Sequence, residues 1–367
     1  MSGPPRAPAD APNLLLVLGM HRSGTSAAAR ATAALGFDLG PDLLPPAPAN
    51  PAGFWEDRLF VAFNEALLAA HGARYDTLGF RFSPEAAAEH RAAAQEWIAA
   101  RRLGTRPYAV KDPRLTRLLP FWLPLFAERP EIRPAALLVY RHPESVALSL
   151  AAREGMPRLR ALLLWQEHLL AALRHTEGMR RYLIDYDRLV DDPDGTLTAA
   201  AAGLGLPPPD PEALRGFRSS FLETAYRHSR FTEPPRDAPP GVRRLVRLLA
   251  EAAGRDPSLG TPASRAALAA LFEAEARLEP LAAPLLGEIA RLETELEALR
   301  TWIAGLEAHP GYRAARALWR LWRRARQTLF RSPPPSLPPG PPPAAGREAE
   351  EAGAEAGEKE PPSALAA

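Results

Sequence analysis

Two glycines and a set of hydroxyl residues follow an apolar run near the start of the chain. The segment LLLVLGMHRSGTSAAARATAALGF, residues 14–37, passes through a tight turn bounded by Gly19 and Gly24 and enters a small-residue helix. This is the layout of a phosphate-binding loop, in which a lysine after the second glycine reaches the β- and γ-phosphates of a nucleoside triphosphate. Thr25 stands where that lysine would be. We therefore expect the loop to bind a different anion.

The backbone of this loop is the first part of the expected site. N–H groups of residues 22–26, at the start of a helix, can cradle anionic oxygens, so Ser23, Gly24, Thr25 and Ser26 are predicted to line the anion. Arg22 supplies the positive charge that the absent lysine would have supplied. A strand–turn–helix whose glycines serve only the turn would also explain this motif taken alone.

A second anion-binding pair occurs in the segment VYRHPESVALSLAAR. Arg141 follows an apolar run, and Ser149 comes eight residues later on the next expected helix. At that spacing both side chains can point toward one phosphate, and a guanidinium pairs with phosphate through two parallel hydrogen bonds. The pair is predicted to hold a single phosphate group.

Lysine use points to a third position. The chain holds 45 basic residues, but only Lys111 and Lys359 are lysines, and Lys359 falls in a tail that we expect to be disordered. A lysine kept in an arginine-rich chain suggests a site that needs a compact ammonium, with chance as the alternative explanation. Asp112 next to it is expected to orient Lys111 or to cap a helix, and Arg114 to contact a substrate or solvent.

A proton acceptor is expected in the segment NPAGFWEDRLF. Glu56 follows Phe54 and Trp55, whose apolar side chains can desolvate the carboxylate and raise its pKa toward a useful range. Asp57 is the alternative base, and a helix N-terminal acid is the purely structural interpretation of either carboxylate. His21, inside the loop, is a further alternative, although we expect it to shape the loop instead.

The segments GMHRSGTS, RHPESVALS and YDRLVDDP together resemble the sulfotransferase family, and they span residues 14–193. The resemblance implies the donor 3′-phosphoadenosine 5′-phosphosulfate, released as adenosine 3′,5′-bisphosphate, and no metal. It assigns Arg22 and the loop residues to the 5′-phosphosulfate, and Arg141 with Ser149 to the 3′-phosphate. Such a donor has no β- or γ-phosphate, which explains why the loop lacks a lysine.

The same resemblance gives the catalytic residues their expected roles. Family members that act on sugars or tyrosine commonly use Glu as base, which favours Glu56, and bacterial relatives carry a Lys-Asp-Pro like that at Lys111, with the lysine near the transferred group. The glycine-rich basic loop of the cytosolic branch has no clear counterpart here. Residues 225–231, AYRHSRF, are a weak substitute for it.

Two other functions remain open at this point. A kinase of the phosphate-binding-loop class that has lost its standard lysine would prefer ATP with Mg²⁺. A scaffold that no longer turns over would keep the fold and recruit partners through its C-terminal helices. The joint presence of Arg22, Arg141, Ser149 and Lys111 argues against a decayed site.

The elements that position these residues follow an alternating pattern. Apolar runs precede the loop, Lys111, Arg141 and Asp187, and each is followed by helical periodicity. Short buried strands separated by helices predict a parallel sheet covered on both faces, with ligands beyond the carboxyl ends of the strands. We expect an α/β, P-loop-type three-layer sandwich over residues 13–232.

The two ends of the chain predict other structures. Residues 1–12 and 332–367 are rich in Pro and Ala and are expected to be disordered, and residues 233–284 form a helical extension. A heptad pattern over residues 285–306 predicts a short coiled coil that could join two copies, with an ordinary amphipathic helix as the alternative. Residues 311–331 hold seven arginines, two tryptophans and no acid, which indicates peripheral membrane contact or a helix docked on the protein.

Composition sets outer bounds on the function. Hydrophobic residues make up 46% of the 367 residues, which is enough for a core, and the net charge of +2 gives no reason to expect a nucleic-acid partner. The absence of cysteine excludes disulfides and thiol catalysis. We expect a cytoplasmic protein at the inner face of the membrane, with an acceptor hydroxyl on a carbohydrate or glycolipid, because the C-terminal helices resemble those of bacterial surface-polysaccharide enzymes.

Overall fold

The computed structural model describes residues 10–47, 50, 53–220 and 230–330. Contacts group the chain into one unit that ends at Glu293 and a second unit that begins at Thr294. The first unit contains the sheet and every residue expected in the site. Of the segments 1–12 and 332–367, expected to be disordered, only residues 10–12 are among the described residues. Residue 331 and residues 225–229 of the predicted basic segment also lie outside them.

The sheet consists of four parallel strands in the order β2-β1-β3-β4. Their bounds are β1 Leu14–Leu18, β2 Tyr108–Lys111, β3 Pro134–Tyr140 and β4 Arg181–Asp185. In the ladder Val17 pairs with Lys111, Leu18 with Leu138, and Tyr140 with Asp185. Because β1 is flanked by β2 and β3, the loop that follows β1 lies between the carboxyl ends of those two strands.

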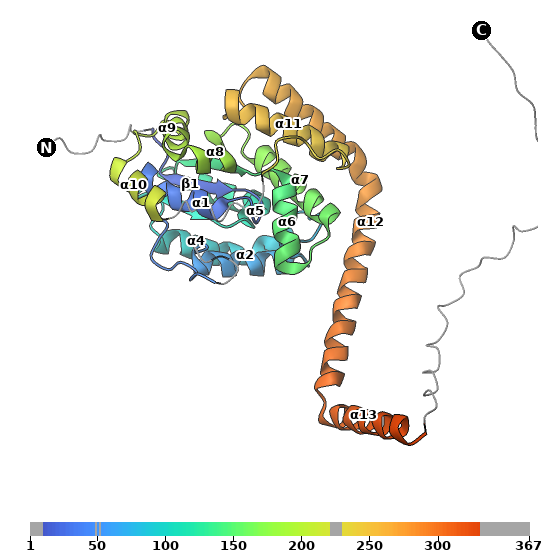
Figure 1. Ribbon diagram of the computed structural model, residues 1–367. Coiled ribbons are helices and arrows are strands. Elements are labelled where there is room, and N and C mark those ends of the chain that lie inside the picture. Colours follow the sequence, from blue (N-terminus) through green and yellow to red (C-terminus); the bar gives the residue numbers. More distant parts are fainter. Residues whose placement is uncertain (1–9, 48–49, 51–52, 221–229, 331–367) are drawn as a thin grey trace, which may run out of the picture. The chain divides into compact units, whose positions relative to one another are not determined.

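Helices cover both faces of this sheet (Figure 1). The helices of the first unit are α1 Thr25–Ala31, η1 Thr32–Leu35, α2 Arg58–Ala70, α3 Pro84–Ala87, η2 Ala88–His90, α4 Arg91–Ala100, α5 Leu115–Ala127, α6 Pro143–Glu154, α7 Arg158–His175, α8 Tyr186–Asp191, α9 Pro193–Leu204, α10 Pro211–Ser220 and α11 Pro240–Arg255. The expected α/β three-layer fold with a central parallel sheet is confirmed.

Alternation along the strands builds the two cores. Leu14, Leu16 and Leu18 of β1 pack with α2, α5 and α7, while Leu15 and Val17 pack with α1, α9 and α10. All five side chains are fully buried. Successive side chains of a strand point to opposite faces, so an uninterrupted apolar run is what a strand buried on both faces requires.

Helix α11 lies beyond the boundary expected at residue 232, yet its apolar face joins the main core. Val242, Leu245, Val246 and Leu249 are each at most 1% exposed and belong to the same cluster as β1 and β3. The helix contacts α7 and β4. The core around the sheet therefore includes residues beyond the expected domain boundary at residue 232.

The C-terminal part of the described chain is helical, with α12 at Pro262–Ala308 and α13 at Pro310–Phe330. Helix α12 runs through Pro280 and Pro284, so the end of the expected helical extension and the heptad segment that begins at residue 285 form one continuous helix. Its heptad positions, from Leu285 at 67% to Leu306 at 41%, are exposed. Pairing of two copies through residues 285–306 stays a prediction. Within the described residues no helix has the length and apolarity needed to cross a bilayer.

Leu249→Ala should lower the free energy of unfolding of the sheet unit by about 2–5 kcal/mol, because it opens a cavity in the shared core. Arg247→Ala, on the exposed side of the same helix, is the matched control and should change little. Urea unfolding measures both variants. An unchanged midpoint for Leu249→Ala would mean that α11 is not part of this core.

Candidate active site

The loop between β1 and α1 has a course that only glycine allows at one position. Gly24 has φ +86°, and a Cβ built there would lie 2.0 Å from Cδ2 of Tyr186. At the start of the loop, the Gly19 N–H donates to Oγ1 of Thr116 over 3.1 Å. The loop backbone is therefore held close to the Tyr186 ring on one side and to Thr116 on the other.

Three of the predicted anion ligands come together beside this loop, and we call Arg22, Arg141, Ser149 and Tyr186 the arginine group. Nε of Arg22 donates to Oγ of Ser149 over 2.8 Å, and Nη1 of Arg141 donates to the Arg22 carbonyl over 3.2 Å. The Arg141 guanidinium lies 4.7 Å from the centre of the Tyr186 ring. The structure thus joins residues from the segments that follow β1 and β3 with residues of α6 and α8.

Arg22 is held differently from the expectation. It was assigned to the 5′-phosphosulfate, but its side chain turns toward Ser149, the residue expected at the 3′-phosphate. Arg22 also has φ +67°, a left-handed conformation that is uncommon for a residue with a Cβ. Residues held in such conformations gather at functional sites.

The electrostatics of the arginine group favour an anion. The pKa of Arg22 is lowered, first by burial and then by the positive charges of Arg153 and Arg141. An anion placed among these cations would relieve that repulsion. Next to Arg22, the Ser23 side chain is fully buried, and its Oγ has no hydrogen-bond partner within the described part of the chain.

A second group lies at the carboxyl end of β2, and we call Lys111, Glu56 and Ser26 the lysine group. Nζ of Lys111 donates to the Phe54 carbonyl over 3.0 Å and to Oγ of Ser26 over 3.3 Å, and it forms an ion pair with Glu56. Lys111 is 3% exposed and Glu56 is 5% exposed. Both members of the ion pair are therefore largely removed from water.

The lysine group also holds a strained turn. Trp55 has φ +58°, and it lies between the two Lys111 acceptors, the Phe54 carbonyl and the Glu56 carboxylate. A non-glycine residue in this region costs about 1–3 kcal/mol, which the surrounding contacts must offset. Lys111 supplies two of those contacts from a rigid strand.

The ionisation of Glu56 is shifted in the direction that suits a base. Burial raises its pKa, the Lys111 charge partly opposes that shift, and the Asp112 charge adds to it. His21 behaves in the opposite way, because burial and then the Arg114 charge lower its pKa well below the usual value. Its ring lies 4.3 Å from that of Tyr75, so His21 is a neutral, packed residue near neutral pH.

Both carboxylate oxygens of Asp57, the alternative base, make contacts that stabilise the fold. Its Oδ1 accepts a hydrogen bond from the Phe60 N–H and so caps α2. Its Oδ2 forms an ion pair with Nε of Arg101 over 2.5 Å. Asp112 likewise accepts from Nδ2 of Asn64 over 2.9 Å and from Arg114 over 3.0 Å. Of the adjacent carboxylates at 56 and 57, only Glu56 pairs with Lys111.

Several contacts in the site involve residues that sequence reasoning did not select. Tyr186 is the first residue of the YDRLVDDP segment, so its motif was recognised while its ring contact was not. Asn50 donates to Oγ of Ser26 over 3.3 Å, and Thr116 bonds the loop start. Of the weak substitute segment 225–231, the described end brings Phe231 against His142, with ring centres 5.4 Å apart.

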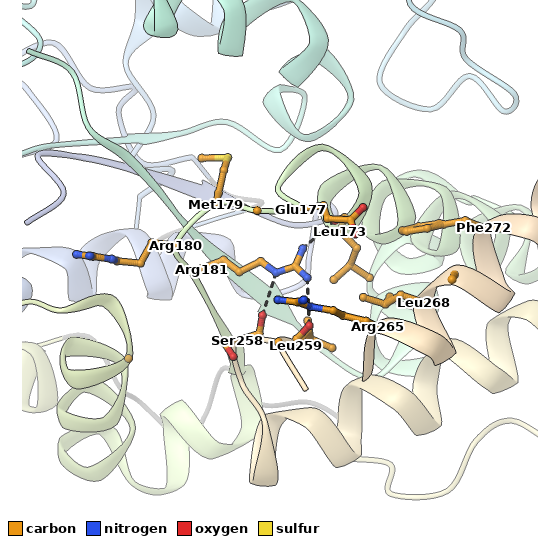
Figure 2. Close-up of a pocket in the computed structure, with 14 residues that line it drawn as sticks. Leu173, Glu177, Met179, Arg180, Arg181, Ser258, Leu259, Arg265, Leu268 and Phe272 are labelled. Atoms are coloured by element: carbon orange, nitrogen blue, oxygen red, sulfur yellow. Dashed lines mark hydrogen bonds between the residues drawn. The ribbon is translucent and has the colours of Figure 1, made fainter. Parts of the chain in front are cut away.

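A pocket of about 510 Å³ lies elsewhere, near the amino end of β4 (Figure 2). Arg181 points into its wall, where the guanidinium donates to the carbonyls of Ser258 over 3.0 Å and Leu173 over 2.8 Å. These bonds make Arg181 a brace between β4, α7 and the segment before α12. The pocket is at the amino ends of the strands, whereas the arginine and lysine groups lie at their carboxyl ends. None of the residues of those two groups lines the pocket.

The solved structures found to be similar to this chain include two sulfotransferase domains. No family model and no curated protein matches the chain. The sulfotransferase domain from the curacin biosynthetic pathway is 18% identical, with 55% of this chain and 76% of that domain covered and a TM-score of 0.35. The sulfotransferase domain of the Synechococcus PCC 7002 olefin synthase is 18% identical, with 70% and 99% covered and a TM-score of 0.38.

Lys111→Met should destabilise the protein by about 3–5 kcal/mol near neutral pH, because it leaves Glu56 buried without its cation. The pKa of Glu56 then rises further above its ordinary value of 4.5, so the loss is small below pH 4.5 and grows as the pH rises. Urea unfolding at several pH values measures this.

Lys111→Met with Glu56→Gln is the matched control, since it removes both charges and should recover much of the stability with little pH dependence. A deficit of Lys111→Met that stays constant with pH, or that the second substitution does not reduce, would contradict the buried pair.

Proposed function

We propose that the protein is a sulfotransferase that moves a sulfuryl group from 3′-phosphoadenosine 5′-phosphosulfate to an acceptor hydroxyl. One observation carries the proposal: the loop of residues 22–26 is contacted at its two ends by two different charged groups. Arg141 bonds the carbonyl of Arg22, and Lys111 bonds the hydroxyl of Ser26. A donor with anions at two separate positions fits this arrangement better than a single triphosphate chain.

The residues present fit the 3′-phosphate end of such a donor. Arg141 is 7% exposed and lies over the Tyr186 ring, and its neighbours Arg22 and Ser149 add a guanidinium and a hydroxyl. Hydrogen bonds from arginine to phosphate are charge-assisted and are roughly twice as strong as neutral ones. ATP lacks a 3′-phosphate, so this group would favour the bisphosphate nucleotide.

The loop and the lysine group fit the other end. The buried hydroxyl of Ser23, the backbone around Gly24 and the Ser26 hydroxyl lie between Arg22 and Lys111 along the loop. Bound there, the donor would supply a sulfuryl group for transfer to an oxygen nucleophile. Lys111 would stabilise negative charge that develops on the departing phosphate, a role for a compact cation in a site with little water.

Glu56 would take the proton of the acceptor hydroxyl. Its raised pKa brings the carboxylate closer in basicity to the working pH than an ordinary Glu, which makes general-base catalysis more effective. The neighbouring Lys111 keeps enough of it ionised to act. Asp57 is left as the cap of α2, and His21 as a packed residue of the loop.

The acceptor and the location are a further part of the proposal. A hydroxyl on a carbohydrate or glycolipid, sulfated in the cytoplasm at the inner face of the membrane, fits an enzyme whose C-terminal helix carries a basic, tryptophan-bearing face. Metal ions have no part in the roles assigned here.

Adenosine 3′,5′-bisphosphate should raise the thermal midpoint of the full chain. At one hundred times its dissociation constant, a ligand stabilises the fold by about 2.7 kcal/mol. Arg141→Ala should abolish the shift, and Arg247→Ala on the surface should keep it. A shift only with ATP and Mg²⁺ would favour the kinase instead, and no shift with either nucleotide would favour the scaffold.

Glu56→Gln should lower turnover of the donor by roughly 10²–10⁴-fold, measured as release of the bisphosphate in a screen of sugar and glycolipid acceptors. In the unaltered enzyme kcat/KM should fall as the pH drops through the raised pKa of Glu56, because the base becomes protonated. The variant should still bind the bisphosphate. Full activity in Glu56→Gln would remove this residue from the mechanism.

A further inference from the structure

Helix α13 separates its arginines from its large apolar side chains. At about 100° per residue, the five arginines 313, 316, 320, 323 and 324 fall within an arc of roughly 100°. Tyr312, Leu318, Trp319, Leu321 and Trp322 occupy an arc of roughly 180° on the other side. The segregation is therefore nearly complete, with Arg326 as the one arginine that falls inside the apolar arc.

The apolar arc is exposed to solvent in the described chain. Leu318 is 67% exposed, Leu321 is 62% exposed, and Trp319 and Trp322 are 45% and 54% exposed. These four large apolar side chains lie within five consecutive residues, less than two turns of the helix, and they make a surface that water solvates poorly. Packing within the described part of the chain does not cover them.

The arginines adjoin the tryptophans. The Arg323 guanidinium lies 5.4 Å from the Trp319 ring centre, and the Arg326 guanidinium lies 5.3 Å from that of Trp322. Residues 310–330 contain no Asp or Glu, so the helix carries only positive side-chain charge apart from its contact with Glu307 through Arg316. A partner that matches this helix must offer both an apolar region that can bury the tryptophans and leucines and negative charge for the arginines.

We propose that α13 binds the surface of an anionic lipid bilayer and lies in the plane of the interface. Its tryptophans and leucines would enter the boundary between headgroups and acyl chains, and its arginine arc would face the lipid phosphates. Tryptophan favours this depth because its ring is apolar and its N–H is polar. The proposal is independent of the sulfuryl-transfer reaction.

Other occupants fit the two arcs less well. A nucleic acid would contact the arginine arc but would leave the exposed leucines and tryptophans in water. A second copy of α13 would cover the apolar arc, but it would leave the arginine arc on the opposite side of each helix without a counter-charge, since the helix carries no acid. An anionic bilayer satisfies both arcs at once.

Vesicle co-sedimentation of the full chain tests the proposal. The protein should sediment with vesicles of phosphatidylcholine and phosphatidylglycerol, should not sediment with phosphatidylcholine alone, and should bind less as salt rises. Trp319→Ser with Trp322→Ser should lower the partition coefficient more than tenfold. Trp302→Ser is the matched control, since Trp302 is 62% exposed on the preceding helix.

Arg320→Gln should lower partitioning roughly fivefold, which corresponds to about 1 kcal/mol per arginine at an anionic surface. Equal binding to neutral vesicles, or binding that the paired tryptophan variant leaves intact, would overturn the proposal. Failure to bind vesicles, together with a dimer in lipid-free solution that the tryptophan variant abolishes, would identify the face as a contact between two copies.

Discussion

The ion pair between Lys111 and Glu56 is the interaction on which the site depends. Lys111 is the last residue of the edge strand β2, and its ammonium contacts Glu56, the Phe54 carbonyl and the Ser26 hydroxyl. It thereby links the strained turn at Trp55 to the first turn of α1. An arginine would need more space and a planar set of acceptors, so the one lysine of the described chain occupies the position where a compact cation is required.

Sheet order explains why two charged groups meet at one loop. Strand β1 lies between β2 and β3. Lys111 is the last residue of β2 and Arg141 directly follows β3, so the two side chains reach the loop after β1 from its two sides. The connection after β1 leads toward β2, and the connection after β3 leads the opposite way, toward β4. Such a switch point opens a crevice at the carboxyl ends of the strands. The large pocket at the amino end of β4 has no such arrangement, because its arginine is used as a brace.

The sequence was sufficient to predict the four strands and the helices on both faces, because buried parallel strands appear as short apolar runs. Of the residues that it selected, the structure joins Lys111 with Glu56 and places Arg141 and Ser149 in contact with Arg22, while their roles stay predictions. The sequence could not predict the direction of the Arg22 side chain, which depends on a left-handed backbone. The contact of the Tyr186 ring with Gly24 and the different partners of Glu56 and Asp57, which are Lys111 and Arg101, likewise depend on contacts between distant segments.

A crystal structure of the protein with adenosine 3′,5′-bisphosphate would test the central claim most directly. The account predicts the 3′-phosphate among Arg141, Arg22 and Ser149, and the 5′-phosphate against the loop of residues 23–26, on the side of Lys111. A nucleotide bound in the reverse orientation, or bound away from this loop, would contradict the assignment of the two charged groups to the two ends of one donor.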